Sequence, residues 1–352
     1  VALQETLDYP GGRTASLYQA RTLRIMVKPI AGAAFLAHSA GIFTAAALAR
    51  LDALGHRDDL NPADRKKVAS VLQAPAGFDK PENFELMSGG TATSRASPTR
   101  DAFSHSSANL SFKQERDFKL GNGLFRKLWV SSPSSTQASD GLGPLFIARS
   151  CQRCHLKDGR GRAPTPDGKA TTFLMRLSVP PQSAADRKAL ASRRTLSIPE
   201  PVYGGQLQDA AVPGLAAEGR ITVEYEEIPV ALAGGETASL RRPSYEIERL
   251  GYGAMHPDVM LSPRVATPMI GLGLLDAIHE GDILANADPD DRDGDNISGR
   301  PNMVMDETSG SIVAGRYGWK ATQPTVVQQS AHAFSGDIGI STSIAPSPWG
   351  LS

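Results

Sequence analysis

Cysteine is scarce in this chain, as are aromatic residues and net charge. The 352 residues contain two Cys, and 6% of them are Phe, Trp or Tyr. Two cysteines are too few for the disulfide framework of a small secreted domain. The 37 basic and 37 acidic residues cancel, so no basic surface indicates a nucleic-acid partner. Gly and Pro are plentiful, at 34 and 25 residues, and they predict many loops and turns.

The first fifty residues differ in character from the rest. Residues 30–49 are uncharged and rich in alanine, three basic residues stand shortly before them, and Ala-Leu-Ala ends the stretch. This order is typical of a secretory signal. We therefore predict that residues 1–49 are an upstream segment plus a signal-peptide-like leader, and that 50–352 form the folded domain. The protein is then periplasmic or otherwise exported, and it touches a membrane only through an uncleaved leader. A buried Ala-rich helix is the alternative.

Helix-start signals and apolar periodicity predict helices joined by long connections. Asn61, which precedes a proline, and Ser111, which precedes a glutamine by three residues, are typical helix N-caps. A further helical segment is expected from 144 toward 151. Gly234-Gly235 separates two extended segments and predicts a β-hairpin near 221–247. We expect a mainly α fold with this hairpin or small sheet inserted, α+β overall.

Both cysteines lie in one short motif, Cys151-Gln152-Arg153-Cys154-His155. On one helical turn, residues i and i+3 share a face, so each thiol can form a thioether with one vinyl group of a haem. His155 then serves as the proximal iron ligand. A zinc site would need a fourth ligand, and a thioredoxin-like redox pair would need a strand–turn–helix context. The motif therefore predicts covalent haem c.

Several long segments around this motif are similar to the di-haem oxidoreductase family, also called thiol-oxidoreductase-like. The similar segments are residues 141–161, 201–220, 258–278, 288–302 and 315–325. The resemblance, which runs from about Leu60 to Gly339, implies an exported c-type cytochrome with a cytochrome c-like haem core, related in design to bacterial di-haem peroxidases. The family has a second CxxCH in a C-terminal part. This sequence has none up to Ser352, so we expect a haem domain that is C-terminally incomplete or a one-haem protein.

The distal iron ligand has several candidates. Met269 or Met260 would give the His/Met ligation of an electron-transfer site, and His105 or His256 would give bis-His ligation. A methionine that fills the core is the ordinary alternative for either Met, and a hydrogen-bonded histidine is the alternative for either His.

Arginines are candidates for binding the haem propionates, because a guanidinium forks onto a carboxylate. We assign this role to Arg160 and Arg264, with Arg162 as a further candidate. A solvated surface arginine is the alternative for each of them.

An acidic run gives a second chemical signal. Asp291, Asp293 and Asp295 occupy positions 1, 3 and 5 of a calcium-type loop. Position 6 is Asn296 instead of Gly, and position 12 is Asn302 instead of Glu, so the match to an EF-hand is incomplete. Ca²⁺ is a candidate cofactor, and a hydrated acidic turn is the alternative.

These patterns predict a c-type haem protein that carries out one-electron transfer. Peroxide reduction is a further activity if the distal iron position opens. The expected partner is a redox protein or a small oxidant such as peroxide. The alternatives are a pure electron carrier with both axial positions filled, and a haem-bearing accessory protein in metal handling without enzymatic activity.

Overall fold

The computed structural model describes residues 54–73, 77–82, 84–87, 89–96, 98–165 and 172–347. The leader predicted within residues 1–49 lies outside these ranges. Among the described residues, no helix has both the length and the apolar character needed to cross a membrane.

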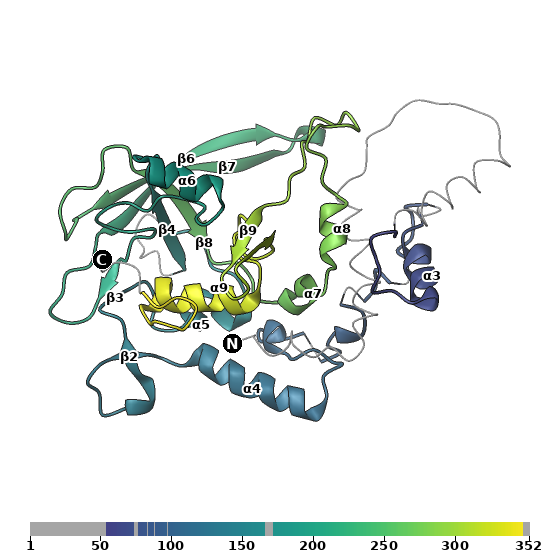
Figure 1. Cartoon of the computed structure of the whole chain (residues 1–352), viewed down its shortest axis with the longest axis horizontal. Helices are drawn as coiled ribbons and strands as arrows, with labels where there is room; N and C mark the ends of the chain where they lie inside the picture. The colour runs from purple at the N-terminus through teal and green to yellow at the C-terminus, as the bar shows by residue number, and fades with distance from the viewer. Residues whose placement is uncertain are drawn as a thin grey trace.

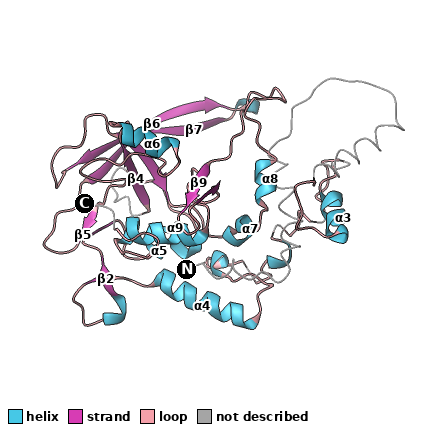
Figure 2. Ribbon diagram, in the orientation of Figure 1, coloured by secondary structure: helices cyan, strands magenta, loops and turns pink. Residues whose placement is uncertain are grey.

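Helices and strands are interspersed along the described part of the chain (Figures 1 and 2). The α-helices are α3 (Pro62–Val71), α4 (Phe112–Arg126), α5 (Cys151–Cys154), α6 (Ala184–Ala191), α7 (Leu272–Asp276), α8 (Glu280–Leu284) and α9 (Val326–Ala333). The strands are β1 (Val130–Ser131), β2 (Asp140–Leu142), β3 (Leu145–Phe146), β4 (Phe173–Ser178), β5 (Ala210–Ala211), β6 (Arg220–Ala231), β7 (Thr237–Glu248), β8 (Met260–Val265), β9 (Met303–Asp306) and β10 (Ser311–Ala314). A π-helical turn, Phe334–Ile338, continues α9.

The expectation of a mainly α fold is wrong. Helices account for 27% and strands for 22% of the described residues, and the strands pair into five two-stranded sheets, so the fold is mixed α/β. The segment 144–151 is also not helical: β3 occupies its first part, and α5 begins only at Cys151. The reason is tertiary pairing, because short strands such as β3 and β5 acquire their hydrogen bonds from partners distant in sequence.

Other local predictions are confirmed. β6 and β7 form the expected antiparallel hairpin, with Arg220 opposite Glu248 and Ala231 opposite Thr237. Asn61 caps α3 by accepting a hydrogen bond from a backbone N–H in the first turn. Ser111 caps α4 in a reciprocal capping box.

The largest core cluster forms on one face of β4. The side chains of Phe173, Met175 and Leu177 alternate inward along this strand and pack with Tyr203 and Leu207, all nearly fully buried. β8 pairs antiparallel with β4 along its whole length. The opposite face of the β4–β8 ribbon is therefore not part of this core cluster.

Three parts of the chain lie close to α5 or to the residues that flank it. The segment after β8 is joined to the segment after α5 by backbone hydrogen bonds from Gly161 N to Ala266 O and from Met269 N to Asp158 O. On another side, Ile147 N and Ala148 N both donate to the carbonyl of Asp337 in the π-turn. Figure 1 shows α4 beneath α5 and α9, and α4 and α5 are in contact.

Candidate haem-binding site

α5 is a single helical turn that begins and ends with a cysteine. Ser150 before it is extended, and the His155 backbone N–H donates to Cys151 O at 3.0 Å. The two thiols and the imidazole therefore follow one another around one turn, as the Cys-x-x-Cys-His spacing predicts. Both cysteines are free and partly buried.

A backbone carbonyl distant in the sequence holds the ring of His155. Its Nδ1 lies 2.6 Å from the carbonyl oxygen of Thr267, so Nδ1 carries the proton and donates it. Nε2 is then the unprotonated nitrogen, with its lone pair available to a metal. Burial lowers the pKa of His155, which keeps the imidazole neutral. Phe125 of α4 packs at a ring-centroid distance of 6.1 Å.

The two thiols have the environment of inert cysteines. Burial raises the pKa of Cys151 to about 11 and that of Cys154 to about 12, and Asp337 adds to both shifts. A dithiol that exchanges disulfides needs a lowered pKa, so that thiolate forms near neutral pH. The structure therefore disfavours a thioredoxin-like pair.

A zinc site at the motif is also disfavoured. Within the described ranges, two groups of three ligating side chains have their ligand atoms within 4.8 Å of one another. Neither group includes Cys151, Cys154 or His155. A structural zinc ion needs four ligands converging on one point, which these residues do not provide.

Buried amides and an acid lie beside the motif. The side-chain Nε2 atoms of Gln206 and Gln208 donate to Gly336 O at 2.8 and 2.7 Å, and Gln206 Nε2 also reaches Asp337 Oδ1 at 2.9 Å. Burial raises the pKa of Asp337. The Oε1 atoms of both glutamines are buried and have no hydrogen-bond partner among the described residues. Such unpaired acceptors indicate a polar group that the structure does not contain.

The candidate distal ligands fall into two groups. Met269 and His105 lie on segments bonded to Asp158, three residues after His155: Met269 N donates to Asp158 O, and Ser104, next to His105, donates to the Asp158 carboxylate. His256 Nδ1 accepts from Asp258 N, which leaves the proton on Nε2 and makes this ring a poor ligand. Met260 is 48% exposed at the start of β8.

The candidate arginines also differ from one another. Arg160 and Arg162 are exposed on either side of Gly161. Gly161 packs closely against Thr172, because a Cβ added to this glycine would lie 2.5 Å from the carbonyl oxygen of Thr172. Arg264 is half-buried on β8, and burial lowers its pKa. Of these three candidates, Arg264 is the least exposed to solvent.

The acidic loop brings its three carboxylates together. Asp291, Asp293 and Asp295 offer oxygens within 4.8 Å of one another. Asn296 has φ +67°, the left-handed backbone that position 6 of a calcium loop requires. Asn302, at position 12, instead donates its amide to two backbone carbonyls of a later turn. The loop therefore has the first half of a calcium site.

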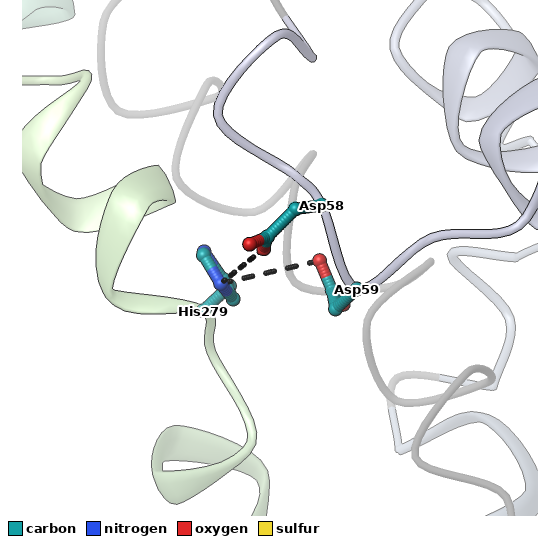
Figure 3. A group of neighbouring side chains, drawn as sticks. All are labelled: Asp58, Asp59 and His279. Carbon is teal, nitrogen blue, oxygen red and sulfur yellow. Dashed lines mark ion pairs between the residues drawn. The ribbon is translucent and has the colours of Figure 1, made fainter.

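A second titratable cluster was not foreseen from the sequence. His279 Nε2 lies 3.9 Å from Asp58 Oδ1 and 4.0 Å from Asp59 Oδ1 (Figure 3). His279 Nδ1 accepts from Gly281 N, so Nε2 carries the proton, and this is the reverse of the arrangement at His155. The neutral ring directs its Nε2 proton toward the two carboxylates and offers no lone pair there to a metal. His279 is more than 200 residues from both aspartates, so no local pattern links them.

Comparison with known protein families matches residues 83–348 to the family described as di-haem oxidoreductase, putative peroxidase. The chain belongs to this family. The match confirms the resemblance found in the sequence and gives the protein a redox function, with haem as the implied cofactor. No curated protein and no solved structure matches the chain.

The donor set fits a haem. Two protonated thiols stand one helical turn apart and are followed by a neutral imidazole whose Nδ1 carries the proton. A hydrogen bond at Nδ1 that leaves Nε2 as the ligating nitrogen is the usual arrangement for a metal-binding histidine.

Proposed function

We propose that this protein is an exported c-type haem protein that transfers single electrons. In this proposal Cys151 and Cys154 hold the haem covalently and His155 Nε2 ligates the iron. The observation that carries the proposal is the hydrogen bond from His155 Nδ1 to Thr267 O, because it fixes the tautomer that a ligand needs. Bound haem supplies the one-electron redox chemistry.

The residues of the motif have distinct roles in attachment and tuning. Each thiol would hold the haem through a thioether formed by addition of its S–H across one vinyl double bond, with sulfur bonded to one carbon and the hydrogen to the other. Cys151 and Cys154 are protonated, as this addition requires. The Thr267 carbonyl pulls on the Nδ1 proton of His155, which makes Nε2 more basic and favours the oxidised state of a bound metal.

Exposed apolar side chains around His155 support this assignment. Leu156 directly follows it and is 54% exposed, and Phe103, 51% exposed, lies against Gly159. Leu124 of α4, next to Phe125, is 52% exposed. Clustered exposed apolar surface is typical of a binding site, and a haem would cover such side chains.

The first test is an absorption spectrum of protein produced in a host with a cytochrome c maturation system. We expect one covalently bound haem per chain, with the pyridine haemochrome of two thioethers. Cys151→Ala should leave one vinyl group unreacted and shift that band. His155→Ala should alter the ligand field of the bound haem, whereas His256→Gln, whose ring is engaged elsewhere, should leave it unchanged. Protein without covalent haem would contradict the proposal.

The distal ligand separates a carrier from a peroxidase. If Met269 ligates the iron, the oxidised protein is low-spin and Met269→Leu removes the methionine–iron charge-transfer band, which favours a pure electron carrier. A high-spin spectrum that changes with hydrogen peroxide favours peroxide reduction. A haem that exchanges electrons with no redox protein and does not react with peroxide would favour the accessory role.

We also propose Ca²⁺ at the loop of Asp291, Asp293 and Asp295. The converging carboxylates and the left-handed Asn296 support it. Calorimetric titration with Ca²⁺ should show binding that Asp293→Asn weakens. Asp290→Asn, which alters an exposed neighbour outside the group, is the matched control. Equal heats for both variants would refute the site.

A further inference from the structure

The described residues line a half-open cavity of about 810 Å³ that does not include the haem motif. This volume lies within the roughly 300–1,000 Å³ range of small-molecule sites. Four arginines line it: Arg176, Arg193, Arg194 and Arg264. The cavity thus combines the size of a ligand site with a strong excess of basic side chains.

Two of these arginines come from the outer face of the β4–β8 ribbon. Leu174 pairs with Arg264 and Arg176 pairs with Ser262, so the two arginines are diagonal neighbours on one face. The core residues of β4 occupy the opposite face. Burial lowers the pKa of both guanidinium groups. Arg176 lies within electrostatic range of the buried Asp337 carboxylate, which raises the pKa of Arg176, and of Arg264, which lowers it. A second guanidinium beside this pair leaves an excess of positive charge, which an anion would neutralise.

The carboxylates in the cavity wall are engaged elsewhere. Glu200 is 2% exposed and accepts hydrogen bonds from the backbone N–H groups of Val202, Tyr203 and His256. Glu307 pairs with His332 Nε2 at 2.9 Å. Arg193, Arg194 and Arg264 form no ion pair with any residue in the described ranges.

The other two arginines follow α6, where the chain turns sharply. Arg193 has φ +57°, a left-handed conformation that costs a non-glycine residue about 1–2 kcal/mol. Glycine is the ordinary residue at the end of a helix in this conformation. A long basic side chain at a position that favours glycine suggests that the side chain is needed there.

A buried acceptor also lines the cavity. The Oε1 atom of Gln323 is buried and has no hydrogen-bond partner among the described residues. An unpaired buried carbonyl is costly, and a hydroxyl group on a ligand would satisfy it. The cavity therefore offers cationic groups on two walls and one neutral acceptor.

We propose that this cavity binds a small organic anion with two or more carboxylates. Arg264 holds one carboxylate from the ribbon, Arg193 and Arg194 hold another from the rim, and a hydroxyl on the ligand reaches Gln323. Guanidinium groups suit carboxylates because two parallel N–H donors match the two oxygens. This site stands on the cavity and its charges, so it does not depend on the function proposed for the haem motif.

Calorimetry on the haem-loaded full chain tests the site, with citrate and tricarballylate as probes. Both carry three carboxylates, but only citrate has a hydroxyl. We expect saturable binding of both, tighter for citrate. Arg264→Gln and the double variant Arg193→Gln/Arg194→Gln should each weaken citrate binding by about ten-fold or more, the loss expected for charge-assisted bonds. The rim variant alters exposed side chains, so it tests the site even if Arg264→Gln does not fold.

Arg187→Gln is the matched control, because Arg187 is exposed on α6 but does not line the cavity. Citrate affinity should not change in this variant. An equal loss in Arg187→Gln would mean non-specific charge attraction and would overturn the proposal, as would the absence of citrate binding.

A second comparison separates a free anion from the carboxylates of the haem itself. Citrate should bind both the haem-loaded protein and the haem-free variant Cys151→Ala/Cys154→Ala. Binding to the haem-free variant alone would show that the haem propionates occupy the arginines, and would overturn the proposal of a separate ligand. If the wild-type chain acquires no haem but still binds citrate, the haem proposal fails and the anion site stands.

Discussion

Glu218 provides the sharpest test of the packing around the site. It is 1% exposed, and its carboxylate accepts a hydrogen bond from Gln208 N at 2.6 Å. Gln208 in turn bonds Gly336 next to Asp337, so Glu218 braces the segment that lies beside the haem motif. Burial raises the pKa of Glu218 to about 7, with a further contribution from Glu200.

The sign of the pH effect follows from this shift. The model-peptide value for glutamate is 4.5, so between pH 4.5 and 7 the unfolded chain has released a proton that the folded protein keeps. The free energy of unfolding therefore falls as pH rises through this window. A shift from 4.5 to about 7, at about 1.36 kcal/mol per pH unit, corresponds to about 3 kcal/mol.

The variant Glu218→Gln should remove this dependence, because glutamine has nearly the same shape, stays neutral and keeps an acceptor for Gln208 N. Urea unfolding of the variant and the wild type should give similar stabilities near pH 4.5. At pH 8 the variant should be more stable by up to about 3 kcal/mol. Comparing the two proteins at each pH cancels the titration of all other groups.

Glu224→Gln is the control, since Glu224 is an exposed glutamate on β6. Its stability should follow that of the wild type at every pH. If the stability difference between Glu218→Gln and the wild type were the same at pH 4.5 and pH 8, the raised pKa of Glu218 would be refuted.

Two further changes test other packing contacts. Gly143→Ala would place a Cβ 2.5 Å from the backbone of Gly339, so thermal unfolding should show that the free energy of unfolding falls by about 1–3 kcal/mol. Gly273→Ala is the control: its Cβ would point into open space, and the variant should lose no stability. Arg57 is 1% exposed and donates to Asp282 Oδ2 at 2.7 Å. Arg57→Met should therefore lower the free energy of unfolding by about 3–5 kcal/mol and speed proteolysis near the N-terminal end of the described part. Unchanged proteolysis would show that the Arg57–Asp282 pair does not hold this end in place.

Local signals in the sequence predicted local structure well. The N-caps at Asn61 and Ser111 and the hairpin around Gly234-Gly235 depend on residues within a few positions of one another. The mainly α expectation failed where structure depends on distant partners. β4 and β8 pair across more than 80 residues, and Pro263 and Arg264 make β8 a weak strand when taken alone.

The sequence by itself predicted haem attachment at Cys151, Cys154 and His155, because a spacing of three and four residues places the side chains about one helical turn apart. It also determined the family, through several motifs in a fixed order. Only the tertiary structure decided which nitrogen of His155 carries the proton, since the acceptor that fixes its tautomer, Thr267, is 112 residues away. The same holds for the arginine-lined cavity: strand pairing sets Arg176 beside Arg264, and no local pattern encodes that pairing.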